Sequence, residues 1–139
     1  MLELNSIAVE PELAEKGVWA EYMGGRFLLA RRGPRYQARL VELYNQHLDL
    51  VKSDTPAGNE KSLEIFRQAF AETILLDWDG IAENGKPVKY TAAEGLKLLA
   101  NPRLFELAQF LETYSNNHTN YQIHVEEEVV KDVKSSAAS

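Results

Sequence analysis

The chain has 139 residues, of which 45% are hydrophobic and 26% are charged, and its formal net charge is -6. This length fits one domain with its own apolar core, and the composition is that of an ordinary globular protein. Because the chain has no cysteine, it can form no disulfide and offers neither a thiol nucleophile nor a sulfur ligand for zinc.

Residues 1–16 show little periodicity, and Pro11 interrupts any helix that starts there. We expect a flexible N-terminal arm whose apolar Leu2, Leu4 and Ile7 could dock against something else. The acidic start lacks the features of a signal peptide, and no apolar run approaches the ~20 residues needed to cross a bilayer. The sequence therefore predicts a protein of the cytoplasm with no membrane contact.

Two short β runs follow, over residues 18–23 and 26–31, and Gly24-Gly25 between them predicts a β-hairpin with a two-residue turn. Gly33-Pro34 ends the second run and begins a helix that is expected to reach about residue 52. Residues 53–59 are rich in turn formers and predict a loop.

The helix expected over residues 60–77 has aromatic and aliphatic residues at four-residue steps that end at Trp78, so we place it at the centre of the core. Residues 79–89 predict a turn. Thr91 and Glu94 have the spacing of a capping box, and Asn101-Pro102 predicts the start of a last helix over residues 102–115.

These elements predict a mainly α fold, a compact helical domain of about four helices with a short N-terminal β-hairpin. One globular domain would span residues 17–118. Residues 119–139, which include Glu126-Glu127-Glu128, would form a weakly structured acidic tail.

The residues that could carry chemistry do not form a recognisable site. His47, His118 and His124 lack the paired spacing of a helical zinc site. A calcium loop that began at Asp77 would need glycine at its sixth position and glutamate at its twelfth, where the chain has Ala82 and Val88. We therefore predict no catalytic residue, no metal ligand, no cofactor and no enzymatic activity.

Five arginines between residues 26 and 39, with no acidic residue among them, are the most suggestive charged feature: Arg26, Arg31, Arg32, Arg35 and Arg39. They could pair with acidic groups inside the protein or on a partner, or they could bind phosphates. The acidic net charge and the lack of aromatic residues placed for base stacking disfavour nucleic acid.

Phe105 and Phe110 fall off the apolar face of the last helix, so they make either a second core contact or a surface for a partner. The candidate partner-binding residues are Arg31, Arg32, Arg35, Phe105 and Phe110.

An ordered series of local motifs runs through the chain and becomes most specific in its second half. Leu76-Asp77-Trp78-Asp79-Gly80 precedes Gly85-Lys86-Pro87, then an aromatic residue with Thr91, and then Leu98-Leu99 before Pro102. The marker residues of the series are Trp19, Tyr36, Trp78, Gly80, Gly85, Pro87, Thr91, Glu94 and Pro102. In this order and spacing, residues 17–114 resemble the small tail assembly chaperones of long-tailed bacteriophages.

This resemblance implies a mainly helical protein that binds the tape measure protein, keeps its long apolar helices soluble and helps to recruit tail tube subunits. It also implies a place in the host cytoplasm and absence from the mature virion, with self-association possible and no catalytic residues to carry over. Two alternatives remain open: a small structural tail component that stays in the virion, and a regulator that binds nucleic acid through the arginine cluster.

Overall fold

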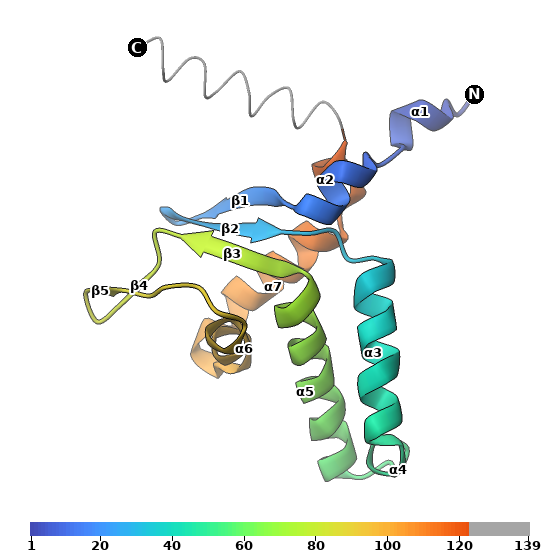
Figure 1. Ribbon diagram of the computed structural model, residues 1–139, viewed down its shortest axis with the longest axis vertical. Helices are drawn as coiled ribbons and strands as arrows, with labels where there is room; N and C mark the ends of the chain where they lie inside the picture. The colour runs from blue at the N-terminus through green and yellow to red at the C-terminus, as the bar shows by residue number, and fades with distance from the viewer. Residues whose placement is uncertain (123–139) are drawn as a thin grey trace.

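The computed structural model describes residues 1–122 and has an α+β architecture, in which helices pack against an antiparallel sheet (Figure 1). The elements follow in the order α1 (Leu4–Ile7), α2 (Pro11–Lys16), β1 (Val18–Tyr22), β2 (Gly25–Leu29), α3 (Pro34–Gln46), α4 (Leu48–Val51), α5 (Pro56–Thr73), β3 (Leu75–Asp79), β4 (Ala82–Glu83), β5 (Lys86–Pro87), α6 (Ala92–Ala100), the 3-10 helix η1 (Pro102–Leu104), α7 (Phe105–Asn116) and the 3-10 helix η2 (His118–Tyr121). The mainly α prediction, about four helices with one short hairpin, is therefore wrong.

The predicted hairpin is present as β1 and β2, but its turn lies one residue earlier than the two glycines suggest. Met23 and Gly24 occupy the turn with φ values of 48° and 89°, and Tyr22 pairs with Gly25. Two consecutive positive φ angles are typical of the type I′ turn, whose twist matches that of the strands it joins. Gly25 is thus the first residue of β2.

The largest error of the sequence prediction lies at the end of α5. The helix predicted over residues 60–77 stops at Thr73, and the chain continues as β3, which pairs antiparallel with β2 and completes a three-stranded sheet in the order β1-β2-β3. Without β3, the second edge of β2 would carry unpaired backbone groups beside the apolar core. The spacing of Phe70, Ile74 and Trp78 favours a helix, but the free energy gained by pairing the backbone of β2 with β3 is larger.

The predicted helix over residues 34–52 is divided as well. It breaks at His47 into α3 and α4, and α5 then begins at Pro56, within the predicted loop, where the Thr55 hydroxyl accepts a hydrogen bond from the Gly58 amide at 3.0 Å. Figure 1 shows α3 and α5 side by side, extending away from the sheet and joined through α4 at their far end. The result is a helical hairpin with one end against the sheet.

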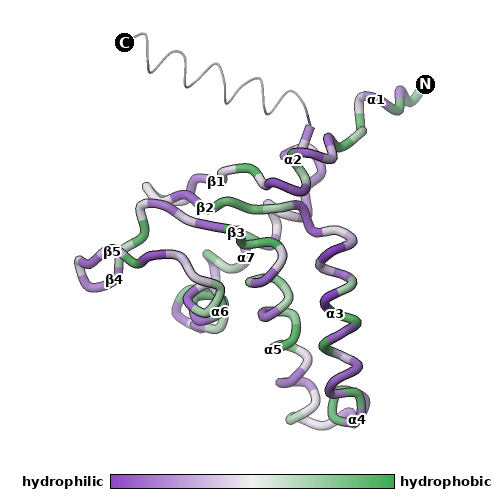
Figure 2. The backbone as a smooth tube through the Cα atoms, viewed as in Figure 1, coloured by the Kyte–Doolittle hydropathy of each residue, from purple (hydrophilic) through white to green (hydrophobic). Residues whose placement is uncertain are grey.

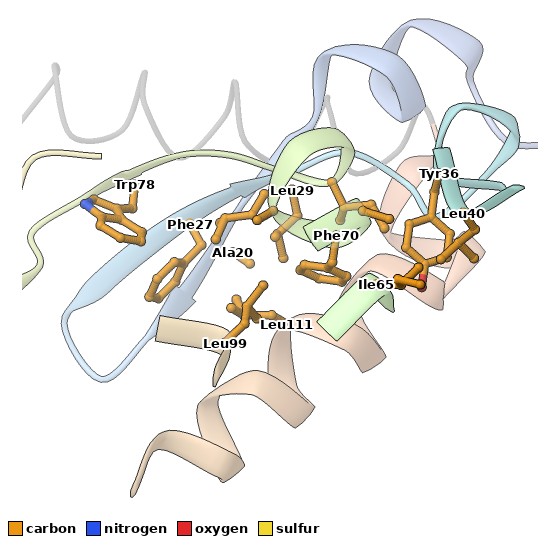
Figure 3. Packing of buried hydrophobic residues seen from close by; sticks show 14 of the residues in the cluster. Ala20, Phe27, Leu29, Tyr36, Leu40, Ile65, Phe70, Trp78, Leu99 and Leu111 are labelled. Carbon is orange, nitrogen blue, oxygen red and sulfur yellow. The ribbon is translucent and has the colours of Figure 1, made fainter. Parts of the chain in front are cut away.

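The core lies between the sheet and the helices and continues between α3 and α5. Phe27 and Leu29 from the sheet, Phe70 from α5 and Leu111 from α7 are all at most 5% exposed. Figure 3 shows these side chains together with Tyr36 and Leu40 at the α3 end and Trp78 at the other. One continuous core therefore joins segments from both halves of the chain.

Trp78 joins β3 to the segment that follows it. Its ring contacts Phe27 and Tyr90 edge-on, with centroids 6.2 and 5.1 Å apart, and its indole Nε1 donates a 2.7 Å hydrogen bond to the Val88 carbonyl. The Tyr90 hydroxyl in turn donates to the Leu75 carbonyl. The motif from Trp78 to Tyr90 thus folds back on itself around the indole.

Glycines permit the turns of that motif, and polar side chains cap the helices that follow. Gly80 and Gly85 have φ values of 73° and 78°, and Pro87 lies in the small β4–β5 hairpin. The Thr91 hydroxyl accepts a hydrogen bond from the Glu94 amide at 3.0 Å, which confirms the Thr91 half of the predicted capping box. Asn101 caps the next turn, but Pro102 starts η1 rather than the α-helix itself.

The two ends of the described chain meet beside the sheet. The Tyr121 side chain is fully buried, its hydroxyl donates to the Leu29 and Ala30 carbonyls, and its own carbonyl accepts from the Glu10 amide at 2.8 Å. The packed chain therefore continues past the predicted tail boundary at residue 118, and the predicted arm contains two short helices. The acidic segment 126–128 lies outside the described residues.

Replacing Trp78 with phenylalanine tests the indole contact. We expect Trp78→Phe to lower the free energy of unfolding by about 1–3 kcal/mol, because it removes a buried hydrogen bond and leaves a gap beside Phe27 and Tyr90. Urea denaturation measures the change. Trp19→Phe is the control, since Trp19 is only half-buried, and equal losses in the two variants would contradict a special role for Trp78.

Burial of Tyr121 predicts a loss of stability in alkali. Burial raises the pKa of Tyr121 well above its ordinary value near 10, so the unfolded chain ionises first as the pH rises. The stability from keeping this phenol neutral is present below about pH 10 and is lost as the pH rises toward the folded-state pKa. Tyr121→Phe should be less stable at pH 8 but should lose less stability between about pH 9 and 11, as measured by urea denaturation. An unchanged pH dependence would contradict this role of Tyr121.

Candidate partner-binding site

A groove of about 380 Å³ opens between α3, α5 and α7, and we call it the α5–α7 groove. Apolar side chains make most of its lining: Tyr36, Leu63, Phe66, Phe70, Leu99, Phe105 and Ala108. Tyr36, Phe70 and Leu99 belong to the buried core, whereas Leu63, Phe66 and Phe105 are 53%, 37% and 58% exposed. The groove therefore exposes to solvent an apolar surface continuous with the core.

The wall on α5 follows from helical spacing. Phe66, Arg67 and Phe70 follow Leu63 by three, four and seven residues, which places all four along one stripe of the helix. Phe66 also contacts Tyr44 of α3 edge-on, with ring centroids 6.0 Å apart. Sequence reasoning assigned Phe66 to the core and did not select Leu63 or Arg67. The three- and four-residue spacing along α5 is the sequence feature that could have identified Leu63 and Arg67.

Arg32 and Arg67 supply positive charge to the apolar groove. The Arg32 guanidinium lies 4.7 Å from the centre of the Tyr36 ring. The backbone amide of Arg32 donates a 3.0 Å hydrogen bond to the Ser115 carbonyl. A cation over a phenol ring is held by the electrostatic field of the ring. Within residues 1–122, neither Arg32 nor Arg67 forms an ion pair. Glu112 and Gln109 complete the polar part of the lining.

Of the five predicted partner-binding residues, the structure brings only Arg32 and Phe105 into this groove. Arg31 and Arg35 line a separate hollow of about 360 Å³ between α2 and the start of α3. Phe110 lies elsewhere, at the edge of the core, with its ring centroid 5.0 Å from Tyr22 and 6.0 Å from Tyr114. The two phenylalanines therefore have different roles.

The remaining arginines of the cluster are engaged with other groups. Arg26 lies over the Trp19 ring at 4.4 Å and pairs with Asp79 at 3.4 Å. Arg39 pairs with Glu42 and Glu72, and its hydrogen bond to Glu72 lowers the pKa of that carboxyl. The five arginines are thus divided among several surfaces rather than gathered into one basic patch.

Neither a cluster of metal ligands nor a membrane-spanning helix is found among the described residues. Within residues 1–122, no group of three or more histidine, aspartate or glutamate side chains is placed to hold a metal ion. Nor does that part of the chain contain a helix with the length and apolar character needed to cross a membrane. Of the histidines named above, His124 lies outside the described residues.

The different surroundings of Phe105 and Phe110 predict different mutational effects. Phe105→Ser should change the free energy of unfolding by less than about 1 kcal/mol, because the side chain is mainly exposed. Phe110→Ser should cost about 1–3 kcal/mol, because it removes packing against Tyr22 and Tyr114. Urea denaturation of both variants measures the difference, and a larger loss at Phe105 would show that it supports the fold.

Comparison with known proteins identifies the family. Residues 32–132 match the family described as YdaY prophage protein. No curated protein and no solved structure matches the chain. The matched segment includes α3, α5 and α7, and hence the whole α5–α7 groove. Because it also covers well over half of the 139 residues, the chain belongs to the YdaY prophage protein family.

Proposed function

We propose that this prophage protein is a tail assembly chaperone, which binds the tape measure protein and keeps it soluble while tail tube subunits are recruited. The observation that carries the proposal is the α5–α7 groove, where Leu63, Phe66 and Phe105 are exposed beside a buried apolar floor. Exposed apolar side chains grouped around a groove suit a site for another protein.

The shape of the groove suits a helical client. An amphipathic helix can lay its apolar stripe into a groove between helices, where side chains at three- and four-residue spacing enter together. A tape measure protein, as a long helical chain with apolar stripes, would expose such surfaces until the tail tube surrounds it. The chaperone would cover them by reversible contacts, with no catalytic step.

The family match supports a prophage origin, and the ordered motif from Trp78 to Pro102 is the feature that resembles tail assembly chaperones. The fold itself is α+β, so the support comes from the order of the motifs and from the groove and not from the expected helical architecture. Binding of nucleic acid finds less support, because Arg26 and Arg39 pair with acidic side chains and Arg31 and Arg35 lie away from the groove.

Co-expression with the tape measure protein of the same prophage tests the proposal. We expect the wild-type chain to raise the soluble yield of the tape measure protein several-fold, and Phe66→Ser combined with Phe105→Ser to remove most of that gain. Val41→Ser is a matched control, because Val41 is 58% exposed, like Phe105, and lies outside the groove lining. The measurement is the soluble fraction on quantitative gels.

Two outcomes would contradict the proposal. One is a soluble yield that the wild-type chain does not change. The other is an abundance of this chain in purified particles, as found by mass spectrometry, which would favour a structural tail component instead.

A further inference from the structure

The N-terminal arm, residues 1–7 with helix α1, carries apolar side chains that the described part of the protein leaves uncovered. Leu2 and Leu4 are each 69% exposed and Ile7 is 44% exposed. A hydrogen bond from the Gln122 side chain to the Ser6 carbonyl, 3.0 Å long, ties the arm to the body without covering them. Apolar residues clustered in so short a segment favour a docking role.

The exposed arm and the α5–α7 groove lie apart in a single chain. Figure 1 shows α1 near one end of the long axis, while the α3–α5 hairpin extends toward the other. Figure 2 shows hydrophobic residues on both the arm and α5. Since Leu4 in the arm and Phe105 in the groove both remain exposed, the arm does not fill the groove of its own chain.

We propose that the arm of a second copy of this chain occupies the α5–α7 groove. Leu4 and Ile7 are three residues apart and share one face of α1, so both can enter an apolar groove together. The charges are also complementary: Glu3 belongs to the arm, whereas the groove lining has two arginines, Arg32 and Arg67, against one acidic residue, Glu112. Neither arginine forms an ion pair within residues 1–122.

Exchange of the two arms gives a closed dimer with two-fold symmetry, in which each chain supplies one arm and one groove. Each contact involves only a few side chains, so the total interface is small and the dimer forms weakly and reversibly. The groove is then covered in the free protein and becomes open when a client displaces the arm. This last consequence rests on the proposed function, whereas the exchange of arms does not.

Sedimentation of the full chain over about a hundredfold range of concentration tests the exchange. We expect a shift from monomer to dimer. Leu4→Ser combined with Ile7→Ser in the arm, and Phe105→Ser in the groove, should each raise the dimer dissociation constant by at least about tenfold. Val41→Ser, equally exposed but outside the groove, should leave it unchanged, and urea denaturation confirms that each variant folds.

Mixing the two variants gives the sharper test. The arm variant keeps an intact groove, and the Phe105→Ser variant keeps an intact arm, so one productive contact can form between them. We expect the mixture to associate under conditions where each variant alone is monomeric, with an affinity below that of the wild-type dimer.

A wild-type chain that stays monomeric, or a dimer that the arm variant does not weaken, would overturn the proposal. So would a mixture that associates no better than its parts. None of these results depends on the tape measure protein, so the proposed function could hold while the exchange fails, and the reverse is equally distinguishable.

Discussion

The pairing of β3 with β2 is the interaction on which the rest of the structure depends. It places Trp78 opposite Phe27 and brings the Ile74 carbonyl to the Ala30 amide, so residues separated by about a third of the chain share one sheet and one core. The direction of α5 follows, because the helix ends directly where the strand begins. The hydrogen bond from the Trp78 indole to the Val88 carbonyl then holds residues 86–90 beside β3, directly before α6 begins at Ala92.

A second set of hydrogen bonds connects the two ends of the described chain with β2. Tyr121 bonds to Leu29, Ala30 and Glu10, and Arg31 donates from its amide to the Ala14 carbonyl. The phenol of Tyr121 thus bonds to the end of β2, while backbone hydrogen bonds of Tyr121 and Arg31 join this region to α2. These hydrogen bonds are made largely by backbone groups, which a pattern of apolar residues does not reveal. The sequence therefore predicted that the globular domain ends at residue 118.

The groove is a consequence of how the helices meet rather than of any one motif. The helical hairpin of α3 and α5 extends beyond the sheet (Figure 1). Leu63 and Phe66 of α5 line the groove together with residues of α7, and they are 53% and 37% exposed. Arg32 is held there by its own backbone bond and by the Tyr36 ring. The groove thus combines an apolar lining with two arginines, Arg32 and Arg67, that form no ion pair within residues 1–122.

The sequence by itself determined the local features: the β1–β2 hairpin, the Thr91 and Asn101 caps and the turn around Gly85. Each depends on residues close together in the chain, whose conformational preferences are strong. Only the tertiary structure decided that residues 75–79 form a strand, that Arg32 and Arg67 share a groove while Arg31 does not, and that Phe110 packs on Tyr22. The physical reason is that an apolar segment such as 74–78 can bury its side chains as helix or as strand, and the unpaired edge of a strand far away in the sequence selects between the two.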